Sequence, residues 1–124
     1  MRIQQLKIFI LLLICSYSCQ SGSRIDYKTV SKHLCSCSDE LYKRNKNFND
    51  FVKLKKQDKA ISLMDSIEVE EEKFQSCILD DNKKHQIFDD KDIVTHMSKS
   101  LKSICPEKEK LIMKVIEDTR LKQN

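Results

Sequence analysis

The chain has 124 residues, of which 34% are charged and 6% aromatic, with six Cys, one Gly, one Pro and a formal net charge of +4. This length fits a single domain. The scarcity of Gly and Pro excludes Gly-rich phosphate loops and folds built on many hairpin turns, while the Lys, Glu, Leu and Ile content favours helices. Acids and bases alternate along the chain and no basic stripe is interleaved with aromatic residues, so we expect no nucleic-acid partner.

The first 18 residues predict a signal peptide. Arg2 and Lys7 flank the start of a short apolar run, residues 8–14, and small residues follow the run. The run is far shorter than the roughly 20 apolar residues that a bilayer-spanning helix needs. We therefore expect residues 1–18 to direct export and to be removed.

The sequence around Cys19 resembles the end of a bacterial lipoprotein signal, in which a small residue, here Ser18, precedes the cysteine that is lipidated. The resemblance covers only residues 1–23 and implies that Cys19 carries the acyl chains, including palmitate, and starts the mature protein. Residues 19–25 would then form a flexible tether to a membrane, facing the periplasm or the cell surface. Ser16 stands where such signals usually have Leu, and ordinary cleavage before Cys19, giving a secreted protein, is the alternative.

The number of cysteines supports the lipoprotein interpretation. If Cys15 leaves with the signal and Cys19 is blocked by lipid, four cysteines remain, and four can pair completely. Free secretion would leave five and strand one thiol in an oxidising compartment.

Residues 26–124 predict a single all-α domain, a small antiparallel three- to four-helix bundle stapled by two disulfides. Apolar residues recur at helical spacing in four successive series. The series are Tyr27, Val30, Leu34, Cys37 and Leu41, continuing through Phe48 and Val52; Ala60, Met64, Ile67, Phe74 and Ile78; Ile93, Met97, Leu101 and Ile104; and Leu111, Ile112, Val115, Ile116 and Thr119.

Two positions compete for the first turn. Asparagines favour a break near Asn47 because Asn is a poor helix former. A turn near Gln57–Asp58 instead brings Cys77 level with Cys37, because a helix rises about 1.5 Å per residue and bridged cysteines need Cα atoms within roughly 7 Å. We prefer this second position, and the same rule places the next turn near Asp90–Lys91.

The ends of the later helices carry their own signals. Asp89 or Asp90 is placed to cap the third helix. Pro106 is expected to end or kink that helix, and a fourth helix then packs back.

The four remaining cysteines allow three pairings, and helix geometry removes one of them. Cys35 and Cys37 point about 200° apart on a helix, so they do not bridge each other. We prefer Cys37 with Cys77, because Cys37 lies on the apolar line, and Cys35 with Cys105 from the flank. The swapped pairing remains the alternative.

A soft-metal site is the alternative use of these cysteines. His33 and Cys37 are four residues apart on one helix face, and thiolates with imidazole bind zinc or copper(I). The alternative ligand set is His33, Cys35, Cys37, Cys77 and Cys105. Because the chain has no Cys-x-x-Cys pair and an exported protein tends to oxidise its thiols, the main expectation is disulfides, no metal and no cofactor.

No catalytic set is recognisable. The histidines, His33, His85 and His96, are distributed one per predicted helix, and the acid pairs Asp80–Asp81 and Asp89–Asp90 are expected in turns as capping residues. We therefore expect a membrane-anchored envelope lipoprotein that binds or fills an assembly, with an envelope protein as partner and no enzymatic activity. The alternatives are a copper- or zinc-handling protein and a small inhibitor or immunity-type lipoprotein.

Overall fold

The computed structural model describes residues 25–124, so the predicted signal peptide and the lipidation site Cys19 lie outside the described residues. Within the described range every regular element is helical. The elements are α2 (Tyr27–Cys37), α3 (Asp39–Lys53), α4 (Gln57–His85), the 3-10 helix η1 (Ile87–Asp89), α5 (Ile93–Ile104), the 3-10 helix η2 (Pro106–Lys108) and α6 (Glu109–Gln123). The expected all-α class is confirmed.

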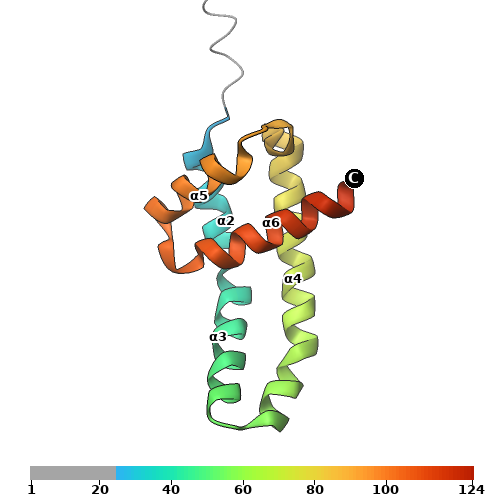
Figure 1. The fold of residues 1–124 in the computed structure, drawn as a ribbon. Helices are drawn as coiled ribbons and strands as arrows, with labels where there is room; N and C mark the ends of the chain where they lie inside the picture. The colour runs from blue at the N-terminus through green and yellow to red at the C-terminus, as the bar shows by residue number, and fades with distance from the viewer. Residues whose placement is uncertain (1–24) are drawn as a thin grey trace, which may run out of the picture.

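The helices form an up-down-up bundle (Figure 1). Helices α2 and α3 follow one another along one side, α4 returns antiparallel to them, and α5 packs against α2. Pro106 follows the end of α5 and opens η2, after which α6 crosses over to α4, so the proline lies at a helix boundary as expected. Helices α3 and α4 extend beyond the other helices as a two-helix hairpin.

The first apolar series spans two helices, because α2 ends at Cys37 and α3 begins at Asp39, with Ser38 between them. The backbone bonding continues almost unbroken there: the N–H of Ser38 donates to the carbonyl of Leu34 at 3.0 Å, and its own carbonyl accepts from Tyr42 at 2.8 Å. The Ser38 hydroxyl donates to the carbonyl of Cys35 at 3.1 Å, a local bond by which serine competes with helical hydrogen bonding. Helices α2 and α3 are therefore joined at Ser38 with almost continuous helical hydrogen bonding, directly after Cys37.

The turns lie close to the preferred positions. Residues 54–56 connect α3 to α4, so Gln57–Asp58 start α4 rather than form the centre of the turn. The competing break near Asn47 is wrong, since Asn47 lies inside α3. Residues 86–92 form the second connection and include the predicted Asp90–Lys91.

The helix starts are capped differently from one another. The Asp26 carboxylate caps α2 by accepting from the backbone N–H of Thr29 at 3.1 Å and from its hydroxyl at 2.7 Å, which holds the pKa of Asp26 below its usual value. Helix α5 begins after Asp92, so the prediction that Asp89 or Asp90 caps it is wrong. The Asp90 carboxylate accepts from the N–H of Asp92 at 2.9 Å and so shapes the turn itself.

One continuous core fills the space between α2, α4, α5 and α6. Burying each aliphatic or aromatic side chain of this kind stabilises a protein by roughly 2 kcal/mol. Its buried members are Val30, Leu34, Cys35, Leu41, Phe74, Cys77, Ile78, Ile87, Ile93, Met97, Leu101, Cys105, Ile112, Met113, Val115 and Ile116. Met64 and Val52 belong to the predicted apolar series but are 55% and 50% exposed, because they lie on α4 and α3 outside the core cluster.

Candidate functional site

Two disulfides start from positions two residues apart on α2, where this helix faces α4 and α5. Cys37 is bonded to Cys77 on α4, with a Cα–Cα distance of 6.6 Å, and Cys35 is bonded to Cys105 at the end of α5, with a Cα–Cα distance of 6.2 Å. This is the preferred pairing, and it excludes the swapped one. Since four cysteines from three helices meet in one cross-section, the bundle is closed at that level by covalent bonds.

The two disulfides differ in burial. The apolar line of α2 predicted that Cys37 is the more buried of its two cysteines, and this is wrong. Cys35 is buried whereas Cys37 is exposed, the reverse of the order that the apolar line predicts. Helix α2 packs against both α5 and α4, so its buried face is broad and shifted, consisting of Val30, Ser31, Leu34 and Cys35. Cys37 therefore lies at the edge of α2, next to α4 and open to solvent.

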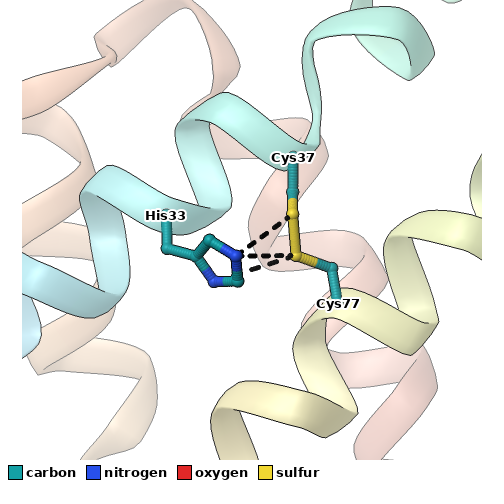
Figure 2. A group of neighbouring side chains, drawn as sticks. All are labelled: His33, Cys37 and Cys77. Atoms are coloured by element: carbon teal, nitrogen blue, oxygen red, sulfur yellow. Dashed lines mark hydrogen bonds between the residues drawn. A yellow bond between two sulfur atoms is a disulfide. The ribbon is translucent and has the colours of Figure 1, made fainter.

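His33 lies against the exposed disulfide (Figure 2). Its Nε2 atom is 3.6 Å from the Sγ atom of Cys37 and 3.6 Å from the Sγ atom of Cys77. Helix α2 presents His33 and Cys37 on one face, because residues four apart lie one above the other. The imidazole is thus held within contact distance of both sulfur atoms.

The other nitrogen of His33 is bonded to Asp81, a residue that the sequence reasoning misplaced. Asp81 was expected in a turn, but α4 continues to His85, and Asp81 lies inside the helix with only 3% of its surface exposed. The Nδ1–H group of His33 donates to Asp81 Oδ2 at 2.8 Å. Asp81 follows Cys77 by four residues on α4, just as Cys37 follows His33 on α2, and these two matched spacings are the signal that could have identified it.

The five residues of the alternative metal set do not form one cluster. His33, Cys37 and Cys77 place their candidate ligand atoms within 4.8 Å of one another. Cys35 and Cys105 form a separate, buried pair, and Lys108 donates from Nζ to the carbonyl of Cys35 at 3.0 Å. Lys108 also pairs with the Asp39 carboxylate, which lowers the pKa of that carboxyl group.

A second polar cluster joins the start of α2 to the loop before α5. The Tyr27 hydroxyl donates to Asp90 Oδ2, and the Nδ1 atom of His96 lies 2.8 Å from the same oxygen. These two bonds, the one from Tyr27 first, lower the pKa of Asp90 to about 2. Burial and the bond to the carboxylate raise the pKa of Tyr27 above its usual value. The tyrosine therefore keeps its proton and the aspartate its charge, as suits a latch between elements 63 residues apart.

This cluster borders a groove of about 600 Å³ at the end of the bundle where α2 begins. The groove is lined by Ile25, Tyr27, His85, Gln86, Asp89, Asp90 and His96. Three of its ionisable groups, Tyr27, Asp90 and His96, bond to one another, so the groove is a polar recess in which these groups are already engaged. No residue spacing predicts the cluster, because Tyr27 and Asp90 meet only through the packing of α2 against α5.

No protein-family model, curated protein or solved structure matches this chain. The site is therefore interpreted from its own geometry. Among the described helices, none combines the length and the apolar character needed to cross a membrane.

Proposed function

We propose that this protein is an exported lipoprotein, anchored through Cys19, whose helical domain is a non-catalytic binding module of the cell envelope. The N-terminal sequence supports export and anchoring. Two disulfides support an oxidising compartment outside the cytoplasm, since such bonds persist there and are rare inside. The rigidity that they give the bundle suits a module that presents a fixed surface.

The observation that carries the binding role is the tip of the α3/α4 hairpin, residues 51–64. Four large apolar side chains are half or more exposed there: Val52, Leu54, Ile61 and Met64. Clustered exposed apolar residues on a small soluble domain are typical of interaction surfaces. The tip is therefore the surface that we assign to partner binding.

The charge and the position of the tip indicate the kind of partner. The tip carries four lysines, Lys53, Lys55, Lys56 and Lys59, against the single acid Asp58. Such a surface complements an apolar groove bordered by carboxylates. The tip lies at the opposite end of the bundle from the start of α2, where the tether would join. This position supports a partner other than the anchoring membrane, and we take that partner to be another envelope protein.

Crosslinking from two matched positions tests the binding role. A photoreactive residue at position 61, in the tip, is expected to capture one envelope protein, and the same residue at position 121 on α6 is not, although Leu121 is equally exposed. The substitution Leu54→Ser should abolish the capture, whereas Leu121→Ser should leave it intact. Equal capture from both positions, or capture that survives Leu54→Ser, would refute the assignment. A stoichiometric target whose activity is blocked would define the inhibitor class.

The intact mass of the mature protein tests the anchor. We expect the mass of a chain that starts at Cys19 with acyl chains attached, and Cys19→Ala should release the protein from the membrane fraction. A plain unmodified chain starting at Cys19 would refute anchoring and support secretion.

A further inference from the structure

We propose that reduction of the Cys37–Cys77 disulfide converts the His33 cluster into a zinc site with an open coordination position. The cluster consists of His33 Nε2 and the two sulfur atoms, all within 4.8 Å of one another. It uses neither the lipid anchor nor the hairpin tip, so it is a property of the bundle itself and goes beyond the proposed binding role.

The distances already match a tetrahedral zinc centre along two edges. With zinc about 2.3 Å from sulfur and about 2.0–2.1 Å from nitrogen, a tetrahedral site separates a sulfur and a nitrogen ligand by about 3.6 Å. His33 Nε2 lies 3.6 Å from each sulfur atom in the disulfide form. The sulfur–sulfur edge has to open, to about 3.8 Å by the same geometry, and the imidazole has to turn towards the metal position. We expect rotation of the His33, Cys37 and Cys77 side chains to supply both changes.

Asp81 supplies the second, independent observation. By accepting the Nδ1 proton of His33 at 2.8 Å, its buried carboxylate fixes the proton on that nitrogen and leaves Nε2 as the free ligand atom of the ring. The Sγ atom of Cys77 lies 3.8 Å from Nδ1 and 3.6 Å from Nε2, to the side of the ring, so the side chains have to turn before Nε2 points at a shared metal ion. A carboxylate behind a histidine is the usual support of a metal-binding imidazole. Disulfide sulfur atoms carry no proton for Nε2 to accept, so the free lone pair gains nothing from them while the disulfide is intact, whereas a metal ion would bind it.

Exposure distinguishes this disulfide from the other one. Cys77 is 9% exposed, but Cys37 is exposed and 46% of the His33 side chain is accessible, so a metal ion can enter from the side of these two residues and a fourth ligand, water or a partner group, can bind. Cys35 and Cys105 are 8% and 5% exposed. A site with three protein ligands and one open position is the arrangement found in reactive rather than purely structural zinc sites.

The chemistry balances with a dithiol as reductant. The dithiol delivers two electrons and two protons to the Cys37–Cys77 bond, which becomes two thiols, and the dithiol itself becomes a disulfide. Zn²⁺ then binds the two thiolates and displaces both protons to solvent, while neutral His33 contributes its Nε2 lone pair. The two thiolates neutralise the charge of the ion, so the loaded site carries no net charge in its first coordination sphere.

Cobalt(II), a spectroscopic substitute for zinc, provides the test. The mature protein is reduced anaerobically with a phosphine and titrated with Co²⁺, and we expect one equivalent bound with the thiolate charge-transfer and tetrahedral d–d absorption bands. Zn²⁺ should displace the cobalt and protect Cys37 and Cys77, but not the other two cysteines, from alkylation mapped by mass spectrometry. Protection of Cys35 and Cys105 instead, or no protection of any thiol, would overturn the proposal.

Variants separate a built site from adventitious binding by free thiols. Asp81→Asn, which keeps the size of the buried side chain, should weaken Co²⁺ binding by about 10- to 100-fold, as the loss of a supporting carboxylate does elsewhere. His33→Ala should weaken it at least as much, and the matched change His96→Ala should leave it unchanged. The double change Cys35→Ala with Cys105→Ala should retain binding. Unaltered affinity in both Asp81→Asn and His33→Ala would refute the site. It would show that Co²⁺ binds to cysteine thiols of an unfolded chain, for which these two residues do not matter.

Discussion

Removing the buried disulfide should cost the bundle much of its stability. Cys35 and Cys105 are 70 residues apart, and replacing both with Ala frees that loop in the unfolded chain. The chain-entropy relation gives about 4.4 kcal/mol for this loop and about 3.9 kcal/mol for the 40-residue separation of Cys37 and Cys77. Cys35 and Cys105 are both buried, whereas only Cys77 is buried in the other pair, so loss of the first pair leaves the larger void, which adds about 1 kcal/mol. The expected costs are thus about 5 and about 4 kcal/mol.

Urea unfolding of the two double-alanine variants measures these costs. Each variant should unfold at a clearly lower urea concentration, with a larger dependence on denaturant because the unfolded chain is less constrained. In thermal scans the buried-pair variant should melt at least roughly 20 °C below the parent. A loss below about 2 kcal/mol for the buried pair, or a greater loss for the exposed pair, would refute the reasoning from loop length and burial.

Three further changes test other parts of the fold. Asp90→Asn should lose 1–2 kcal/mol at neutral pH by weakening the latch. The pKa of Asp90 in the folded protein is about 2, below its ordinary value of 3.8, so this stabilisation is complete above about pH 4 and disappears as the pH falls through 2. Thermal melts followed by circular dichroism across this pH range, on the parent, the variant and the exposed control Asp89→Asn, check the expectation. Gln86→Gly should raise the unfolding free energy by about 0.5–1 kcal/mol because Gln86 has a φ of 54° at the end of α4. Lys84→Gly, two residues earlier and within the helix, should lower it by about 1 kcal/mol. Phe74→Ala should cost about 3–5 kcal/mol in urea unfolding because the ring is buried in the core, and a cost below 1 kcal/mol would show that the core does not close around it.

The two disulfides differ in burial and therefore in the role that we assign to each. The buried bond joins α2 to the end of α5 where the core is continuous, so it serves stability. The exposed bond joins α2 to α4 beside His33 and Asp81, where reagents can reach it. At one level of the bundle, a buried disulfide that stabilises the fold therefore lies beside a more accessible disulfide, which we propose a dithiol can reduce.

Much of the fold could be predicted from the chain alone, because the observations were local or could be reduced to helix geometry. The apolar spacing located the helices, and the rise of a helix, combined with the assumption that the cysteines pair, selected the turn near residue 57 over the one near Asn47. Asn47 shows why propensity failed there: a weak helix former is tolerated inside α3 because the packing of α3 against α4 outweighs a few tenths of a kcal/mol.

The tertiary structure alone decided which residues of each helix are buried and which polar groups meet. Sequence periodicity placed Cys37 on the apolar line, yet α2 contacts two helices at once, and its inward face is therefore rotated towards Cys35. Asp81 reaches His33 across 48 residues. Its four-residue spacing from Cys77 puts both residues on one face of α4, but the contact itself depends on how α4 packs against α2, which the spacing alone does not determine. The sequence by itself determined the helices, their order and the level at which the cysteines meet; the side-by-side packing of α2 with α4 and α5 determined that one disulfide is buried and the other lies open beside a histidine and a carboxylate.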